Sequence, residues 1–233
     1  MDIYKKRRVK LIGTLVIGLF IVVAINSPTY TSIESVNEGV ALGVSDNKLA
    51  VEVLKNLQIK GRAPKTGYER SQFGPGWSTN SGCDTRNIIL NRDLSNVKID
   101  DECNVTSGTL NDPYTGKIIE FKRGSGTSGK VQIDHVVALS DAWQKGAQLL
   151  TREAREQLAN DPLELLAVDG PSNLEKSDGD AATWLPSNKS FRCQYVARQV
   201  AVKQKYKLWL TQAEYNAINN ILDNCPNQIL PTK

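Results

Sequence analysis

The chain is poor in the residues that mark several large enzyme classes. It has a single histidine, His135, among 233 residues. One imidazole is too few for H-E-x-x-H metal chemistry, and with no cysteine pair nearby it also disfavours a zinc hydrolase. The chain has no C-x-x-C pair and no G-x-S-x-G element of an α/β-hydrolase. The absences therefore argue against zinc peptidases and serine hydrolases of these types.

The net charge is also small and unevenly placed. The chain has 29 basic and 25 acidic residues, a formal charge of +4. Five of the basic residues and one acidic residue lie in residues 1–26, so the remaining chain carries 24 of each. The positive excess therefore does not indicate a nucleic-acid partner. Hydrophobic residues make up 40% of the chain and charged residues 23%, which excludes wholesale disorder.

No hydrophobic run reaches the roughly 20 residues of a typical membrane-spanning helix. The longest, LIGTLVIGLFIVVAI at 11–25, follows a basic cluster as in a secretory signal. Asn26 is a poor residue before a cleavage site, so a cleaved export signal and an uncleaved membrane anchor both stay open for residues 1–26. A buried core helix is the third interpretation. With either of the first two, the protein works outside the cytoplasm, secreted or anchored at the membrane, and residues 27–47 are a polar spacer.

The four cysteines agree with export. An even number of widely spaced cysteines in an exported chain predicts disulfides. Pairing Cys83 with Cys103 and Cys193 with Cys225 is the simplest of three possible connectivities. A bridge that closes a loop of this size contributes about 3 kcal/mol to stability.

Hydrophobic periodicity predicts an α+β domain over residues 48–225, followed by a short tail at 226–233. Residues 46–57 predict a short amphipathic helix. Residues 61–130 are rich in Gly, Pro, Asn and Asp and predict loops and short strands without a long helix. Strands are predicted at 131–139 and 163–169, and helices at 140–148, 151–160, 191–208 and 211–224. Thr211 and Glu214 form a capping-box pattern at the last helix.

Asp134 and His135 stand together at the first of these strands, and Asn173 follows the second strand. A lone histidine more often has a structural role. A neutral imidazole, however, can take a proton from water at neutral pH. Carboxylate and amide oxygens suit Mg²⁺, which would hold a phosphate oxygen and stabilise the leaving 3′ oxygen. The three residues therefore favour a phosphodiesterase, with the structural histidine as the competing interpretation.

Several long blocks around these residues resemble a known family. They include DHVVALSDAWQKGAQ, LANDPLELLAVDGPSN, EKSDGDAATWLP, RCQYVARQVAVKQKY, KGRAPKTGYERSQFG, GCDTRNIILNRDL and SGTLNDPYTGK. The chain resembles secreted bacterial HNH endonuclease-family proteins, whose catalytic domain is shared with the carboxy-terminal part of GmrSD-type restriction enzymes. The resemblance covers residues 48–225 and implies a ββα-metal, or His-Me finger, core.

By this resemblance His135 is the general base, and Asp134 and Asn173 hold one divalent ion, Mg²⁺ or Mn²⁺. Lys176 and Asp178 look like supports of the helix start or phosphate contacts. Glu164 departs from the pattern, because the family has an asparagine there that would brace the loop carrying the histidine. Glutamate could accept the same hydrogen bond or add a charge near the metal.

Two segments concentrate positive charge. Residues 181–210 have six basic and no acidic residues, and residues 55–70 have five basic residues and Glu69. We expect Arg192, Arg198 and Lys203, with Lys176, to line a substrate groove. A solvated helix face is the competing interpretation. Arg86 is a candidate phosphate contact or a partner of Asp84 or Asp93. The four tryptophans are expected mainly in the core rather than stacked on bases.

The sequence thus predicts an exported, monomeric, metal-dependent HNH endonuclease. It would hydrolyse phosphodiester bonds of DNA, with RNA left open, and with little sequence preference. A second hypothesis is a non-catalytic extracellular nucleic-acid-binding protein on a degenerate HNH scaffold, for which Glu164 is the main motive. A third is a structural envelope protein with a buried core histidine.

Overall fold

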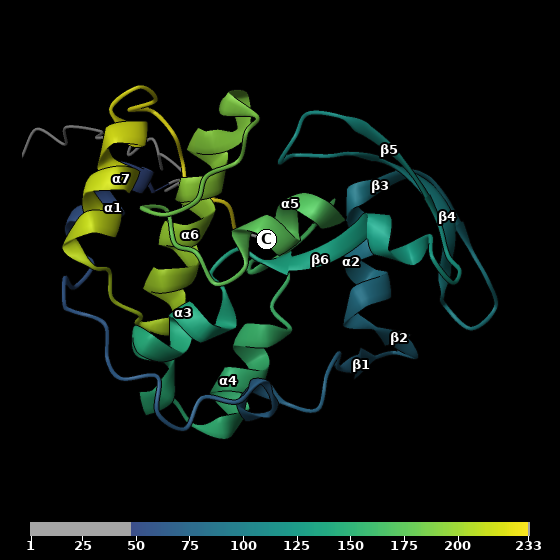
Figure 1. Ribbon diagram of the computed structural model, residues 1–233, viewed down its shortest axis with the longest axis horizontal. Helices are drawn as coiled ribbons and strands as arrows, with labels where there is room; N and C mark the ends of the chain where they lie inside the picture. Colours follow the sequence, from purple (N-terminus) through teal and green to yellow (C-terminus); the bar gives the residue numbers. More distant parts are fainter. Residues whose placement is uncertain (1–47, 233) are drawn as a thin grey trace, which may run out of the picture. The chain divides into compact units, whose positions relative to one another are not determined.

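Two apolar segments that lie apart in the sequence form the central β-ribbon of the computed structural model, which describes residues 48–232 (Figure 1). The expectations for residues 1–26 and 27–47 lie outside the described residues. Within 48–232 no helix is both long and apolar enough to cross a membrane. The mixture of helices and small antiparallel sheets confirms the predicted α+β class.

The first part of the described chain alternates short helices with strands. Its elements are α1 (Ala50–Lys55), η1 (Arg70–Phe73), β1 (Thr79–Asn80), β2 (Cys83–Asp84), α2 (Thr85–Asp93), β3 (Leu94–Ile99), β4 (Val105–Asn111) and β5 (Ile118–Lys122). β1 and β2 form a two-stranded sheet, and β3, β4 and β5 a three-stranded one in that order. All these pairs are antiparallel.

The second part contains the central ribbon and the longer helices. Its elements are η2 (Ser128–Lys130), β6 (Val131–His135), α3 (Leu139–Gln144), η3 (Ala147–Leu149), α4 (Arg152–Ala159), β7 (Leu165–Asp169), α5 (Gly170–Lys176), η4 (Lys189–Phe191), α6 (Arg192–Tyr206) and α7 (Gln212–Leu222). β6 pairs antiparallel with β7, from Val131 opposite Asp169 to His135 opposite Leu165.

The β6–β7 ribbon separates two hydrophobic cores. Side chains alternate across a strand, so Ile133 and Leu165 pack with α2 and the β3–β4–β5 sheet. Leu166 and Val168 face the opposite way, into the larger core of α1, α3, α6 and α7. Figure 1 shows these helices on one side of β6 and the three-stranded sheet on the other. The ribbon is therefore fixed from both faces.

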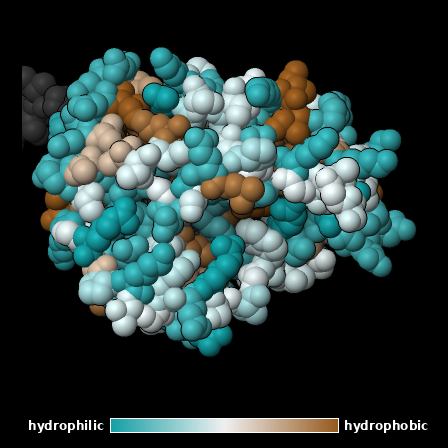
Figure 2. All heavy atoms as spheres, viewed as in Figure 1, coloured by the Kyte–Doolittle hydropathy of each residue, from teal (hydrophilic) through white to brown (hydrophobic). Residues whose placement is uncertain are grey.

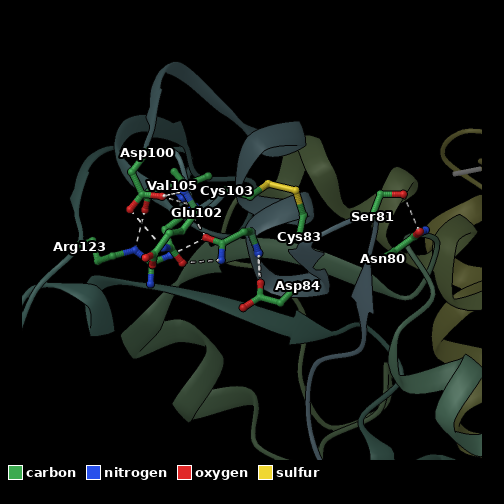
Figure 3. The surroundings of a disulfide bond; sticks show 11 residues. Asn80, Ser81, Cys83, Asp84, Asp100, Glu102, Cys103, Val105 and Arg123 are labelled. Atoms are coloured by element: carbon green, nitrogen blue, oxygen red, sulfur yellow. Dashed lines mark hydrogen bonds between the residues drawn. A yellow bond between two sulfur atoms is a disulfide. The ribbon is translucent and has the colours of Figure 1, made fainter.

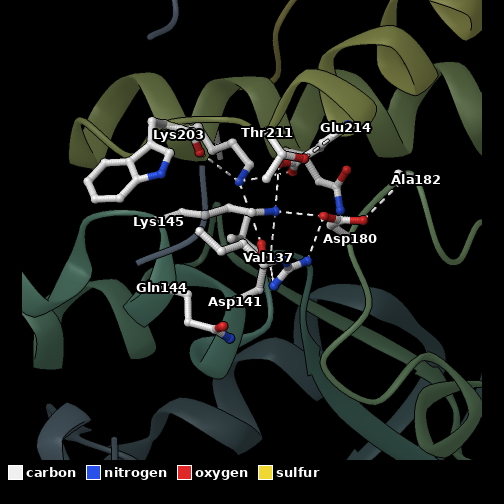
Figure 4. Close-up of polar contacts among 12 residues, drawn as sticks. Val137, Asp141, Gln144, Lys145, Asp180, Ala182, Lys203, Thr211 and Glu214 are labelled. Atoms are coloured by element: carbon white, nitrogen blue, oxygen red, sulfur yellow. Dashed lines mark hydrogen bonds and ion pairs between the residues drawn. The ribbon is translucent and has the colours of Figure 1, made fainter. Parts of the chain in front are cut away.

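A buried charge network lies within the helical core (Figure 4). The ammonium group of Lys145 is fully buried and contacts Asp141 at 2.7 Å, Asp180 at 2.8 Å and Glu214 at 2.6 Å. Lys203 adds a second buried ammonium 3.0 Å from Glu214. Because opposite charges are paired, the helices α3, α6 and α7 bury these groups together.

Both expected disulfides are present in the structure. Cys83–Cys103 links β2, which precedes α2, to the turn between β3 and β4 (Figure 3). Cys193–Cys225 links the start of α6 to the segment after α7. The local pairing predicted from the sequence is therefore confirmed, and no free cysteine lies in residues 48–232.

The predicted elements are found with small differences in their bounds, except in residues 61–130. That segment was expected without a long helix, yet α2 has nine residues, and Asp84 caps it by accepting from Asn87 N at 2.7 Å. Thr211 caps α7 as predicted by accepting from Glu214 N at 3.2 Å. The Glu214 side chain does not complete a capping box, because it points into the charge network.

The segment after residue 225, expected as a tail, is paired with the start of the domain. Ala50 N donates to Gln228 O at 2.8 Å, and Leu230 N donates to Lys48 O at 2.9 Å.

The surface seen in Figure 2 is mostly hydrophilic with small separate hydrophobic patches. Exposed Leu174 on α5 and Ile118 on β5 are among the large hydrophobic residues at the surface.

Candidate active site

Two antiparallel strands and the helix that follows them bring the candidate residues together. β7 runs directly into α5, and Asp169 caps this helix by accepting from Ser172 N at 3.0 Å. Gly170, the first residue of α5, lies so close to η2 that a Cβ there would be 2.0 Å from the carbonyl oxygen of Gly129. Only glycine permits this approach. It places α5 against β6, which carries Asp134 and His135.

Asp134 is buried between two donors. Lys176, at the end of α5, donates to Asp134 Oδ1 at 2.8 Å, and the Tyr114 hydroxyl donates to Asp134 Oδ2. Burial raises the pKa of Asp134, against the opposing effect of the Lys176 ammonium and the two hydrogen bonds. Each carboxylate oxygen still has a lone pair for a further ligand.

Tyr114 was not singled out from the sequence. Its position comes from the turn between β4 and β5, where Asp112 accepts from Thr115 N at 2.7 Å and from Asp169 N at 2.8 Å. The fully buried Tyr114 ring packs at an angle against Trp184 and Tyr195. Burial and the charge of Asp134 raise the pKa of Tyr114 well above its usual value, so the hydroxyl stays a donor. The D-P-Y-T-G turn pattern was the available signal, but its distance of 20 residues from Asp134 hid the contact.

The His135 ring is held at its edge and on its face. Nε2 lies 3.0 Å from the carbonyl oxygen of Ala159. A carbonyl can only accept, so Nε2 carries the proton and Nδ1 keeps a free lone pair. Trp77 stacks on the ring at 5.7 Å between centroids and 6° between planes. Burial, together with the charge of Arg70, lowers the pKa of His135 to about 3, so the imidazole is neutral at physiological pH.

Glu164 lies against the loop that follows His135. Its carboxyl oxygens are 3.2 and 3.3 Å from Val137 N, and its carbonyl oxygen accepts from Val136 N at 2.9 Å. The side chain is fully buried, and burial, strengthened by the charge of Asp134 though opposed by Lys176, raises the pKa of Glu164 well above its usual range. The Glu164 carboxyl therefore braces the loop, and of the two roles considered from the sequence the hydrogen-bonding one agrees with the contacts.

Two cavities meet at His135. One, of about 430 Å³, is mainly polar in its lining and includes Gln132, Asp134, Asn173 and Ser140. The other, of about 340 Å³, is lined by Phe73, Pro75, Trp77 and Ala159. The two cavities share Arg70, His135 and Leu139.

The polar cavity contains the two expected metal ligands. Asn173 Nδ2 donates to Gln132 Oε1 at 2.9 Å, which leaves Asn173 Oδ1 as an available acceptor. Within residues 48–232 no three His, Cys, Asp or Glu side chains are grouped as a metal site. One carboxylate and one amide oxygen, with room for water, still form a donor set that fits a hard cation such as Mg²⁺, which usually keeps several waters. The residues present therefore fit the expected ion.

Two lysines predicted as substrate contacts are buried in this structure. Lys203 is fully buried and paired with Glu214, so it cannot reach a nucleic acid. Lys176 is equally buried, and its ammonium is held by Asp134 Oδ1 and by His135 O, both at 2.8 Å. Lys176 therefore positions these two residues, which agrees with the supporting role considered beside a phosphate contact. The sequence showed the charge of both lysines but not their distant acidic partners.

The predicted arginines are used for backbone contacts. Arg192 Nε donates to Pro186 O at 2.8 Å, and Arg198 Nη1 donates to Leu163 O at 2.9 Å. Arg86 Nη2 donates to Val131 O at 3.2 Å and makes no ion pair with Asp84 or Asp93. None of these three lines either cavity at His135. The segment that reaches the site is instead residues 55–70, through Arg70.

The tryptophans follow their expectation in part. Trp143 and Trp209 are buried, and Trp184 packs against the helical core. Trp77 is half-buried and stacks on His135, a role the sequence did not predict. An isolated tryptophan in a Gly-Pro-Gly segment gives no sign of a partner 58 residues away.

Comparisons with known proteins show the family of the chain. The family described as the C-terminal domain of GmrSD restriction endonucleases matches residues 84–221. A protein of the fungus Arthroderma benhamiae, described as an uncharacterized secreted protein, is 37% identical over 179 residues, which is 76% of this chain and 84% of that protein. No solved structure matches. The matched residues contain β6, β7 and α5, so the chain belongs to the family of the C-terminal domain of GmrSD restriction endonucleases.

Proposed function

We propose that this protein is an exported, metal-dependent endonuclease that hydrolyses phosphodiester bonds through a ββα-metal core of the HNH type. The β6–β7 ribbon followed by α5 supports this core, with Asp134 and His135 on the first strand and Asn173 on the helix. The observation that carries the proposal is a neutral His135 beside Asp134 in the cavity that also contains Asn173.

His135 is the proposed general base. The Ala159 carbonyl holds the proton on Nε2 and leaves the Nδ1 lone pair to take a proton from water. Trp77 fixes the plane of the ring, and Lys176 fixes the backbone of His135. A base works best with a pKa near the working pH, and a phosphate anion bound beside the ring would raise the pKa of His135 by stabilising the imidazolium.

Asp134 and Asn173 would hold one divalent ion, Mg²⁺ or Mn²⁺. Such an ion supplies positive charge to a phosphate oxygen and to the leaving oxygen. Tyr114 and Lys176 orient the Asp134 carboxylate, and Gln132 orients the Asn173 amide. These contacts preorganise both oxygen ligands toward the polar cavity.

We propose that the protein acts outside the cytoplasm, on DNA or RNA. Two disulfides and a relative described as secreted support this location. Glu164 was the main reason to consider a non-catalytic nucleic-acid-binding protein. Its buried carboxyl accepts from Val137 N and so has a bracing role, which weakens that alternative.

The experiment is plasmid degradation with Mg²⁺ or Mn²⁺, comparing wild type with His135→Ala and Asn173→Ala. The His135 variant should lose at least about 100-fold in rate. The Asn173 variant should need more metal for half-maximal activity. Equal rates for wild type and His135→Ala would exclude His135 as the base, and no cleavage with any divalent ion would favour the binding protein.

A further inference from the structure

Arg70 lies where the two cavities at His135 meet. It lines both, together with His135 and Leu139. A phosphate bound beside the His135 ring, as the proposed function requires, would lie in a cavity that Arg70 also lines. Arg70 is therefore the basic residue best placed to meet such a phosphate.

The Arg70 guanidinium has no partner in the described part of the chain. It is exposed, and within residues 48–232 it makes no hydrogen bond and no ion pair. The neighbouring carboxylate of Glu69 accepts from Ser71 Oγ at 3.3 Å instead. By contrast, Arg62 is bound to Asp141 and Asp180, each at 2.8 Å. An unpaired arginine at a cavity mouth is free to bind an anion.

The backbone of Arg70 is fixed although its head group is free. Arg70 begins η1, and Phe73 at the end of η1 is buried against Tyr68 and Trp143, with ring centroids 6.3 Å apart in both pairs. Arg155 on α4 donates to Gln72 O at 2.9 Å and to Gln72 Oε1 at 3.2 Å. The side chain is therefore presented from a rigid base.

We infer that Arg70 binds the scissile phosphodiester group, with two guanidinium N–H groups donating to its non-bridging oxygens. This inference rests on the proposed function, because that function places a phosphate before His135. The planar fork of arginine matches two phosphate oxygens. Its charge stabilises the negative charge that accumulates on these oxygens as water attacks. The influence of Arg70 on the pKa of His135 agrees with this proximity.

The test compares Arg70→Ala and Arg70→Lys with Arg152→Ala. Arg152, on α4, is the matched control, because it too is exposed and without a partner in residues 48–232, but it lines neither cavity. Cleavage of an oligonucleotide should fall by about 100-fold in kcat/KM for Arg70→Ala. Arg70→Lys should recover part of the loss, and Arg152→Ala should match wild type. Thermal unfolding should be unchanged in all three.

Binding separates this inference from the proposed function. In EDTA, the affinity for a fluorescent oligonucleotide should fall about tenfold in Arg70→Ala, and the salt slope of log K should shrink by about 1. If wild type binds but never cleaves while Arg70→Ala still loses binding, the phosphate contact stands and the nuclease proposal fails. If wild type cleaves and Arg70→Ala equals Arg152→Ala in rate and salt slope, the inference about Arg70 is overturned.

Discussion

The ammonium group of Lys176 lies 2.8 Å from Asp134 Oδ1 and 2.8 Å from the carbonyl oxygen of His135, so one buried lysine holds both neighbours. The side chain of Lys176 is fully buried. From the sequence, Lys176 was a candidate either for supporting the helix start or for contacting phosphate. In the structure it fixes the end of β6 from the end of α5.

Removing Lys176 should therefore destabilise the fold. Lys176→Met leaves Asp134 buried without its cation, and the free energy of unfolding should fall by about 3–5 kcal/mol in urea titrations. Asp134→Asn in the same background removes the uncompensated charge, so the double variant should be less destabilised than the sum of the single variants. Strictly additive effects would contradict a direct pair.

The stability of Glu164→Gln relative to wild type should increase as pH rises. Burial raises the pKa of Glu164 well above its usual range, so the folded state keeps a proton that the unfolded state loses above about pH 4.3. Stability from this group is therefore full below that pH and falls by up to about 1.4 kcal/mol per pH unit as pH rises. Glutamine cannot titrate but keeps a similar shape and an acceptor oxygen.

The measurement is the difference in unfolding free energy between Glu164→Gln and wild type at about pH 5 and pH 8. The difference should grow toward pH 8. Glu175→Gln, on the exposed side of α5, is the matched control. A constant difference at both pH values would indicate that Glu164 is ionised in the folded state.

Gly170→Ala should disturb the start of α5. Its Cβ would lie 2.0 Å from the carbonyl oxygen of Gly129, and this backbone contact cannot rotate away. The expected loss is at least about 2 kcal/mol in thermal or urea unfolding, with reduced cleavage because α5 carries Asn173. Gly129→Ala is the matched control, since its Cβ meets no atom within 4 Å. Equal stability of the two variants would disprove the close approach.

Lys145→Met should be among the most harmful single changes outside the site. It leaves Asp141, Asp180 and Glu214 without the buried ammonium that joins them, which should cost about 3–5 kcal/mol. Lys65→Met, which breaks an exposed pair with Asp178, should cost less than about 1 kcal/mol. Differential scanning calorimetry distinguishes the two, and a small effect of Lys145→Met would mean that the helices repack around the change.

The sequence predicted what depends on local patterns. Short apolar segments predicted β6 and β7, the carboxy-terminal pattern predicted α6 and α7, and the spacing of four cysteines suggested the observed pairing. The helix α2 was missed because the apolar run NIIL was interpreted without its cap, Asp84.

Long-range partners could not be predicted. We expected Lys203 in a substrate groove, because the sequence does not show its partners Glu214 and Asp141 on other elements. Tyr114 and Trp77 reach Asp134 and His135 only through the packing of distant loops. Arg70 was visible as charge, but its position between two cavities depends on how η1 packs against α4.

The pairing of Leu49 with Ile229 joins the two ends of the described domain, and Cys193–Cys225 fastens the segment that leads to the second end. Both of these segments are engaged in backbone hydrogen bonds, so neither end of the described domain can fray before these contacts open. The same closure brings the ends side by side, which allows the domain to be joined to a neighbouring domain through either end without rearranging β6, β7 or α5.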